Sequence, residues 1–524
     1  MPSFDTQVTA ILRNQPLTEY ESDLLIVPAF MDDTDSNSDD EDEANAKPNF
    51  KMTGCLKTID DAYGGAFSST LSEEKFSASL GKCRIFKARP TDGLKSRWLM
   101  IVGMSAKTTV KFPRFDRLIN AYQKAFSASF GFNNLNKITV CLGDSDQLAP
   151  FSLEQWVYAA VQGAYRATYK TAEADTKKIH EFKELVLLTP ETVDTSVISK
   201  AVITAKAEAL TKDLANQPAN LKSSQALADA AALAKANNGV TLEVISDAKI
   251  LAEKMPAFWA VGQASADVDP PRFIKVQYRS SDATESSPKI ALVGKGVVFD
   301  TGGAQVKPDK YMNDMKFDMT GAATVLSVLR ACAEQQLKNI TVTAYVAAAR
   351  NLIGETCYLP DSIINTSSGK KIEVRHTDAE GRITLADSLW TAAQDKPDKM
   401  ITIATLTGSA AAAVGTATAL MGSCEYLKND VLKAFREVGE LVQKCDFIEE
   451  DYENIKSNLD AADVRNTSKG TGRGHLTAGA FVLTFADDIP TVHLDIAGGD
   501  AKDNMATGIA VKGLLRFVEN MATP

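Results

Sequence analysis

The chain has few of the residues that mark several common kinds of site. It contains only four histidines in 524 residues and no His-Glu-x-x-His motif, so a zinc site built from neighbouring histidines is excluded. Its seven cysteines are scattered, odd in number and without a Cys-x-x-Cys motif, which indicates a reducing compartment. Any metal ion must therefore rely on oxygen ligands.

The sequence also lacks features typical of membrane-spanning, exported and nucleic-acid-binding proteins. Residues 401–422 carry no charge, but they are mostly Ala, Thr, Gly and Ser, so we expect a strand, a loop and a buried small-residue helix there. The N-terminus has no apolar segment typical of a signal peptide. A formal net charge of -10 argues against a nucleic-acid partner. These features predict a cytoplasmic protein without membrane contact.

The negative charge is concentrated in one segment. Residues 32–43 contain eight acids and no base. We interpret this segment as a solvated, disordered loop rather than a binding site, because it is a run of like charges without a base.

The length and the 44% hydrophobic content predict two domains, and the alternation of strand and helix patterns within each predicts an α/β fold. Residues 1–190 alternate apolar runs with helical patterns, and residues 191–216 read as a helical connector that ends before Pro218. Residues 217–524 form the larger domain, where buried strands alternate with helices and predict a mostly parallel sheet covered on both faces. The expected strands are 23–27, 98–102, 137–140, 184–188, 289–299, 340–347, 400–405 and 491–496, and the expected helices include 113–129, 153–169 and 321–336.

The segment 376–382 is the most informative one for function. Asp378, Glu380 and Arg382 stand at alternate positions, so all three point to one side if the segment is extended. Two carboxylates so close together repel, and a bound cation neutralises them most easily. This pattern predicts one half of a metal site.

The other half is predicted at the end of the apolar run 290–299. Asp300 follows this run, and Gly302 and Gly303 allow a sharp turn away from the strand. Ligands in open α/β sheets bind at the carboxyl ends of such strands. Asp300 is therefore expected to face a ligand.

These two segments, in this order, resemble the signatures of the leucyl aminopeptidase family, also called cytosol aminopeptidases. Supporting similarity lies in residues 211–220, 404–408 and 493–498. The family removes N-terminal residues from peptides with the help of two metal ions. The resemblance implies peptide substrates with a free N-terminus, a smaller N-terminal domain related to macro domains, and a homohexamer built from two trimers.

The resemblance also implies the ligands of two divalent ions, with Asp300 and Glu380 touching both. Four carboxylates offer enough oxygens for two ions about 3.5 to 4 Å apart. The lysine of the set binds only after it loses its proton, and its alternative role is an ion pair with Asp300 or Asp318. The residue types leave Zn²⁺, Mn²⁺, Co²⁺ and Mg²⁺ open. The implied ligands are Lys295, Asp300, Asp318, Asp378 and Glu380.

The implied reaction is attack of a two-metal-activated hydroxide on the peptide carbonyl. Asp318 would help to hold the substrate amine, and Lys307 would stabilise the oxyanion. Arg382 would bind a bicarbonate ion that shuttles the proton. Taken alone, Lys307 could instead be a solvated surface lysine, and Arg382 could simply balance Asp378 and Glu380. The positions implied to line the substrate side-chain pocket are Met315, Ala379, Thr405, Leu406 and Gly408, which predict a preference for Leu or Met.

The chain departs from the family pattern at several positions. His376 stands where Asn is usual, and Arg350 begins a segment, 350–356, that replaces a usual Glu-Asn-Met-Pro-rich one. Smaller departures are Thr301, Thr320 and Ile383. Two other readings stay open: a two-metal phosphoesterase, and a family member without turnover that has a structural or DNA-associated role. Because all seven expected metal and catalytic positions are occupied, the sequence favours the aminopeptidase.

Overall fold

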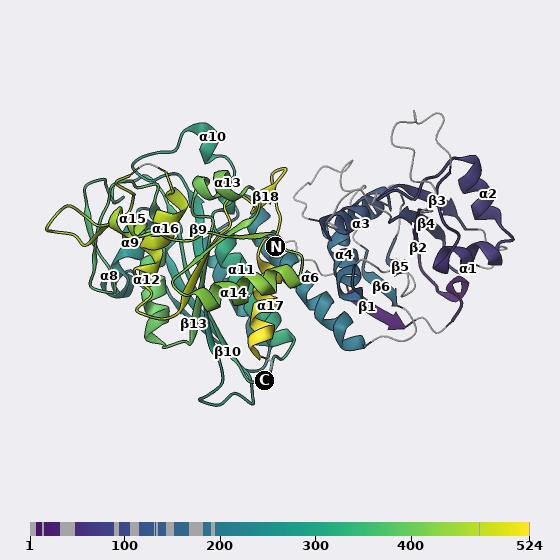
Figure 1. Ribbon diagram of the computed structural model, residues 1–524, viewed down its shortest axis with the longest axis horizontal. Coiled ribbons are helices and arrows are strands. Elements are labelled where there is room, and N and C mark those ends of the chain that lie inside the picture. Colours follow the sequence, from purple (N-terminus) through teal and green to yellow (C-terminus); the bar gives the residue numbers. More distant parts are fainter. Residues whose placement is uncertain are drawn as a thin grey trace. The chain divides into compact units, whose positions relative to one another are not determined.

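The computed structural model describes residues 7–12, 15–31, 48–88, 94–104, 115–129, 132, 135–142, 151–166, 182–189, 194–470 and 472–522. The chain divides into two compact units, residues 2–206 and residues 207–524 (Figure 1). The acidic segment 32–43 lies outside the described residues.

The smaller unit contains a six-stranded sheet in the order β1-β6-β5-β2-β4-β3, which is parallel except for the edge strand β3. Leu24 and Ile26 of β2 contribute to one apolar cluster and Leu25 and Val27 to another, so this strand is buried on both faces. The four predicted strands are confirmed as β2, β4, β5 and β6, whereas β1 and β3 were not predicted. The strands are β1 Gln7–Leu12, β2 Leu24–Ala29, β3 Cys83–Lys87, β4 Trp98–Gly103, β5 Lys137–Cys141 and β6 Glu184–Thr189. The helices are α1 Gly54–Ala62, α2 Ala66–Glu73, α3 Phe115–Ser129, α4 Leu153–Ala164 and the long α6 Thr195–Asn216, within which the division between the units falls.

Cys55 of α1 and Cys141 of β5 are joined by a disulfide. The two cysteines are 86 residues apart. Their scattered spacing gives no local motif from which this pairing could be predicted.

The larger unit is built on an eight-stranded sheet in the order β15-β14-β17-β13-β9-β10-β8-β7. Its centre, from β17 to β10, is parallel, as predicted, and its outer pairs β14·β17, β10·β8 and β7·β8 are antiparallel. The carboxyl ends of β9, β10, β13 and β17 therefore meet at one edge of the sheet. The strands are β7 Val240–Ile245, β8 Arg272–Arg279, β9 Lys289–Asp300, β10 Thr341–Asn351, β13 Lys399–Ala404, β14 Thr418–Gly422, β15 Val442–Lys444 and β17 Thr491–Asp495. Short strands outside this sheet are β11 Ile363–Asn365, β12 Lys371–Glu373, β16 Val464–Arg465, β18 Ala501–Lys502 and β19 Met505–Ala506.

Helices cover both faces of this sheet (Figure 1). Ala291 and Val293 of β9 pack with Leu385 and Leu389 of α12, together with α9 and α16, on one face. Gly294 points to the other face, where α11 approaches so closely that an added Cβ would lie 2.6 Å from the Gly321 carbonyl oxygen. The helices are α7 Ser224–Leu233, α8 Ala248–Lys254, α9 Pro256–Gly262, α10 Asp309–Met312, α11 Thr320–Glu334, α12 Glu380–Gln394, α13 Gly408–Val414, α14 Glu425–Glu437, α15 Glu449–Glu453, α16 Gly474–Leu483 and α17 Val511–Ala522, with a 3₁₀ turn, η6, at Met315–Phe317.

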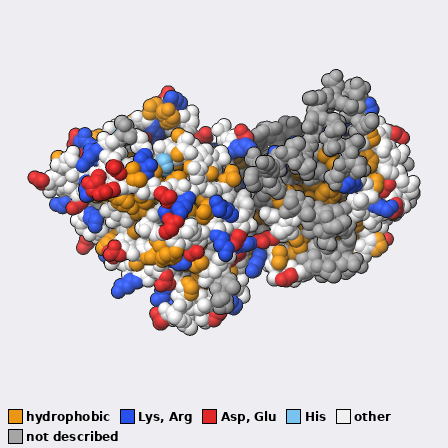
Figure 2. Space-filling model, viewed as in Figure 1, with side chains coloured by type: hydrophobic (Ala, Val, Ile, Leu, Met, Phe, Trp, Pro, Cys, Tyr) orange, Lys and Arg blue, Asp and Glu red, His pale blue; other side chains and the backbone are white. Residues whose placement is uncertain are grey.

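The uncharged segment 401–422 begins with the predicted strand, β13, and continues into the predicted small-residue helix, α13. This helix is not buried as expected, because only Ala410 of it is buried, and the segment ends in a strand, β14, that was not predicted. Within the described part of the chain, no helix has both the length and the apolar character needed to cross a membrane. On the visible face of the larger unit, Lys and Arg side chains are interspersed with Asp and Glu (Figure 2). The surface charge there is mixed.

Candidate active site

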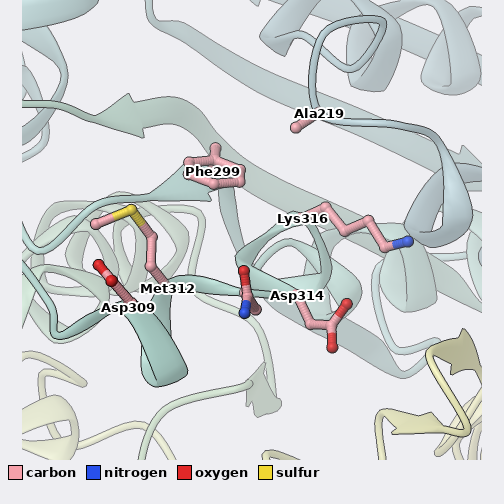
Figure 3. Close-up of a pocket in the computed structure, with 7 residues that line it drawn as sticks. Ala219, Phe299, Asp309, Met312, Asp314 and Lys316 are labelled. Atoms are coloured by element: carbon pink, nitrogen blue, oxygen red, sulfur yellow. The ribbon is translucent and has the colours of Figure 1, made fainter.

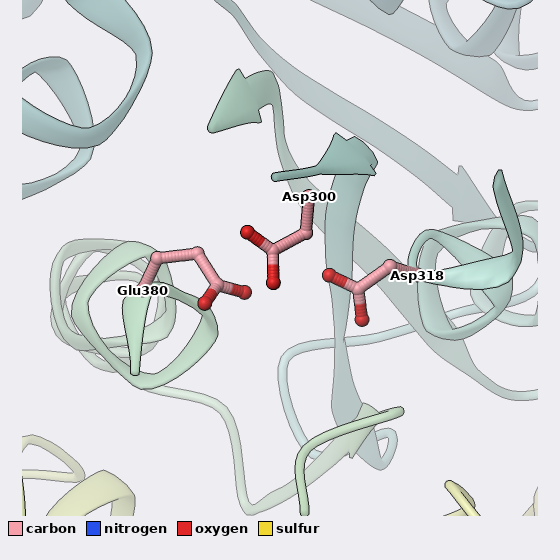
Figure 4. A group of neighbouring side chains, drawn as sticks. All are labelled: Asp300, Asp318 and Glu380. Atoms are coloured by element: carbon pink, nitrogen blue, oxygen red, sulfur yellow. The ribbon is translucent and has the colours of Figure 1, made fainter. Parts of the chain in front are cut away.

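Three buried carboxylates meet at the carboxyl edge of the large sheet. Asp300 ends β9, Asp318 follows η6, and Glu380 begins α12. Each offers an oxygen, and these oxygens lie within 4.8 Å of one another (Figure 4). The exposed fractions of the three residues are only 2%, 5% and 1%. Because burial and mutual repulsion disfavour the charged forms, the pKa values of Asp318 and Glu380 are raised.

Lys295 provides positive charge inside this cluster. Its Nζ lies 2.6 Å from Asp318 Oδ1 and 2.8 Å from Glu380 Oε1, and it donates to the Thr405 carbonyl at 3.2 Å. Burial would lower the pKa of Lys295, but the surrounding carboxylates outweigh burial and raise it. The ion pair with Asp318, which the sequence left open as an alternative, is therefore present in this structure.

Gly381 makes room for this lysine. A Cβ at Gly381 would lie 2.4 Å from Lys295 Cε and 2.7 Å from its Nζ, well inside van der Waals contact. The glycine after Glu380 is thus explained by the passage of the lysine side chain beneath the first turn of α12.

Lys307 joins a fourth carboxylate to the cluster. Its Nζ lies 2.9 Å from Asp300 Oδ2 and 2.5 Å from Asp378 Oδ1. Only 13% of its side chain is exposed, so the reading of Lys307 as a solvated surface lysine is wrong. Burial opposes its charge, but Asp300 and Glu380 raise its pKa. Asp378 reaches the cluster through this lysine and is 30% exposed.

The segment 376–382 is not extended, so the condition under which its three charged side chains would point to one side is not met. Residues 376–379 form a turn, closed by the Ala379 N–H to the His376 carbonyl at 3.2 Å, and α12 begins at Glu380. An acidic residue in the first turn of a helix is favoured by the helix dipole. Three residues at alternate positions therefore point in different directions, because a helix turns by about 100° per residue.

Arg382 consequently faces away from Asp378. Its Nη1 donates to the Asn466 carbonyl at 2.8 Å, while its buried Nε has no hydrogen-bond partner among the described residues. Arg382 also makes no ion pair with Asp378 or Glu380 among the described contacts, so simple charge balance does not explain it. Burial lowers its pKa to about 10, against the opposing pull of Glu380 and Asp495. The guanidinium stays charged and keeps a free donor.

Two residues that the sequence did not single out connect the halves of the site. Asn351 Nδ2 donates to Asp300 Oδ1 at 2.8 Å and to the Thr377 carbonyl at 3.1 Å. Thr377 Oγ1 donates to the Gly302 carbonyl at 2.6 Å and accepts the Gln305 N–H at 2.9 Å. Asn351 stands in register with Asp300 on the neighbouring strand, so a correct alignment of β9 and β10 could have identified it.

The predicted pocket residues lie in chain segments next to the clustered carboxylates. Met315 lies in η6, Ala379 precedes α12, and residues 405–408 follow β13. Thr405 Oγ1 donates to Asp318 Oδ1 at 2.8 Å. Asp495, at the end of β17, accepts the Leu406 N–H at 3.1 Å and thereby fixes this loop.

The unusual Arg350 is accommodated by an acidic partner. Its Nε donates to Asp269 Oδ2 at 2.9 Å, and its Nη2 donates to the Lys222 carbonyl. Lys222 is itself buried, and its Nζ donates to the carbonyls of Ala215, at 2.7 Å, and Lys316. Arg350, at a position where the family usually has Glu, therefore stabilises Lys222, which in turn holds the Lys316 carbonyl of η6.

His376, which replaces the usual Asn, has a local role. Its Nδ1 accepts the Asp378 N–H at 3.1 Å, and the side chain is exposed. A side-chain oxygen of Asn could accept the same bond.

An open cavity of about 540 Å³ is formed by residues that flank the cluster (Figure 3). Phe299 precedes Asp300, and Lys316 belongs to η6. None of the predicted pocket residues lines this cavity. Its lining is Ala219, Phe299, Asp309, Met312, Asn313, Asp314 and Lys316.

Known proteins similar to this chain share this architecture. Residues 209–515 match the family model described as the cytosol aminopeptidase family, catalytic domain. A cytosol aminopeptidase of Pseudomonas aeruginosa is 34% identical over 481 residues, covering 89% of this chain and 94% of the relative. A probable cytosol aminopeptidase of Sulfurihydrogenibium sp. is 34% identical over 464 residues, covering 86% and 87%.

Two solved structures are similar in fold. A mutant of tomato leucine aminopeptidase superposes with a TM-score of 0.79 at 28% identity, over 98% of this chain and 97% of that one. The bottromycin maturation enzyme BotP, in complex with Mn, gives a TM-score of 0.74 at 24% identity, over 96% and 100%, which is a likeness of fold alone.

Proposed function

Because the chain belongs to the cytosol aminopeptidase family and is therefore a hydrolase, we propose that it removes apolar N-terminal residues, Leu above all, from peptides with the help of two divalent cations. The observation that carries this proposal is the convergence of Asp300, Asp318 and Glu380 in a buried cluster.

The cluster suits cations on the chemistry of its donors. Asp318 Oδ2 is buried and accepts no hydrogen bond from any described residue, which is costly unless a positive group faces it. Hard oxygen ligands of this kind suit Zn²⁺, Mn²⁺, Mg²⁺ or Co²⁺. When bound, two such ions would polarise the peptide carbonyl and make water acidic near neutral pH. The residues that would hold them are Asp300, Asp318, Asp378 and Glu380, together with Lys295, which would have to give up the proton that pairs it with Asp318 and Glu380 in this structure.

Two cationic side chains have separate roles in this proposal. Lys307, kept protonated by Asp300 and Asp378, stabilises the negative charge that develops on the carbonyl oxygen. Arg382 keeps Nε free to bind a planar anion such as bicarbonate, which can accept a proton. Asp318 also holds the free amine of the substrate, and this explains a requirement for an unblocked N-terminus.

The side chain of the first substrate residue occupies the space near Met315, Ala379, Thr405, Leu406 and Gly408. We further propose a cytoplasmic homohexamer, which sedimentation velocity would test. The alternative of a family member without turnover is not favoured, because Lys295 and Lys307 form ion pairs with all four of the expected carboxylates at one site.

The test is release of leucine from Leu-p-nitroanilide with added Mn²⁺, Zn²⁺, Mg²⁺ or Co²⁺. Glu380→Gln should abolish turnover and weaken metal binding in calorimetry, whereas Glu453→Gln, on an exposed helix, should change neither. N-acetyl-Leu-p-nitroanilide should not be cleaved. Full activity of Glu380→Gln, or no turnover of Leu-p-nitroanilide by the folded protein with any of the four metals, would contradict the proposal.

A further inference from the structure

Asp500 is a carboxylate near the cluster to which the proposed reaction gives no role. It lies five residues beyond Asp495, in the loop between β17 and β18. The residue is half-buried, and no Lys or Arg among the described residues pairs with it. Its carboxylate accepts hydrogen bonds from the backbone N–H groups of Asp500 and Ala501, which favour the ionised form, and no cationic side chain of the described residues lies against it.

The position of this loop is fixed next to the predicted side-chain pocket. β17 and β13 are parallel neighbours with Asp495 in register with Ala404, so the chain segments after both strands leave the sheet side by side. Gly498 packs so tightly on α13 that an added Cβ would lie 2.0 Å from the Gly415 carbonyl oxygen. The loop that ends in Asp500 therefore begins beside residues 404–407 and then packs on the C-terminal end of α13, the helix that starts at the predicted pocket residue Gly408.

The carboxylate is electrostatically coupled to the centre of the site. It is repelled by Asp495 and attracted by Lys295, whose ammonium lies among the three clustered carboxylates. Burial and Asp495 together raise the pKa of Asp500 to about 7 despite this attraction. An assay at pH 8.5 therefore examines the ionised form.

We propose that Asp500 binds the cationic head group of an N-terminal Arg or Lys, so that the enzyme accepts basic first residues as well as apolar ones. This inference rests on the proposed function. The methylene groups of Arg and Lys are apolar and can contact the same pocket residues as a Leu side chain. Their cationic head group then needs a carboxylate at the end of the pocket farthest from the substrate backbone. The α-amine is already assigned to Asp318, so the side chain is the remaining cation of such a substrate.

The first test uses the metal-loaded wild-type enzyme at pH 8.5 with two anilide substrates, Arg and its neutral isostere citrulline. The proposal expects kcat/KM for Arg to exceed that for citrulline by about tenfold or more, as for one charge-assisted contact. Equal values would overturn it, and this measurement does not depend on any variant folding.

The second test compares Asp500→Asn with Asp503→Asn, which removes the same charge from an exposed neighbour. Asp500→Asn should lower the Arg-to-Leu ratio of kcat/KM about tenfold, and Asp503→Asn should leave it unchanged. If Leu-anilide is cleaved but both variants keep the wild-type ratio, this inference fails while the proposed function stands. If the wild type cleaves neither substrate, the proposed function fails and this inference with it.

Discussion

Substitution of Gly381 by Ala tests whether the position of Lys295 is essential. The added methyl group would lie 2.4 Å from Lys295 Cε, and the lysine is too enclosed, at 3% exposed, to move aside freely. Its Nζ must shift relative to Asp318 and Glu380, which it now contacts at 2.6 and 2.8 Å. Gly381→Ala thus moves the lysine without removing any charged group.

The expected effects on stability and on activity differ in size. Overpacking of this kind costs about 1 to 3 kcal/mol, and Ala in place of Gly within α12 returns about 1 kcal/mol, so the free energy of unfolding should fall by about 0 to 2 kcal/mol. The variant should therefore fold. A displacement of about 1 Å at a reacting centre costs on the order of 100-fold in rate. We expect kcat/KM for Leu-p-nitroanilide to fall by about that factor.

The assay measures kcat/KM, metal affinity and urea unfolding in parallel. The matched control is Gly354→Ala, where an added Cβ would meet nothing closer than the Ala264 carbonyl oxygen at 3.5 Å, and it should behave like the wild type. If Gly381→Ala keeps its activity and metal affinity within about threefold of the wild type, the argument that Gly381 places Lys295 is wrong.

Three further predictions concern two departures from the family pattern, His376 and Arg350, and the buried His493. His376→Asn should keep kcat/KM within about threefold, because an Asn oxygen can accept the Asp378 N–H, and a tenfold change would assign His376 a larger role. Arg350→Met should lower the free energy of unfolding by about 1 to 3 kcal/mol, since it removes a charged donor from the buried Asp269. The double variant with Asp269→Asn should lose less stability than the two single variants lose when their losses are added. His493 is fully buried, and burial together with Arg382 lowers its pKa from 6.5 to about 3. Between pH 6.5 and pH 3, His493 is protonated in the unfolded chain but neutral in the folded chain. The free energy of unfolding should therefore fall by about 1.4 kcal/mol for each pH unit as the pH decreases toward 3. Urea unfolding of His493→Phe should lack this part of the slope, and an unchanged pH profile would show that His493 is not the group responsible.

The apolar run 290–299 was sufficient to predict β9 and the place of Asp300 at its end, because a buried parallel strand has a local signature. The alternate spacing of charged residues was not sufficient to predict the local structure of residues 376–382. Three charged positions fit an extended strand as well as a turn that enters a helix, and the helical pattern that continues to Gln394 decides between them.

The contacts of Asn351 and Thr377 were not predictable from composition or motif. Both depend on how separate segments align in the folded sheet, and no residue near them in sequence reports that alignment. The same holds for the pairing of Asp269 with Arg350, because this departure from the family pattern is explained only by a partner 81 residues away in the sequence.

The hydroxyl of Thr377 joins two segments that are 75 residues apart in the chain. The Gln305 amide donates to this hydroxyl, and the Thr377 amide donates in return to Gln305 Oε1 at 2.8 Å. Hydrogen exchange at these two amides should therefore require the same opening event, since neither bond survives separation of the segments. The proposed metal ligands of the two segments then belong to one cooperative unit, which we expect to assemble late in folding because its closing contact is long-range.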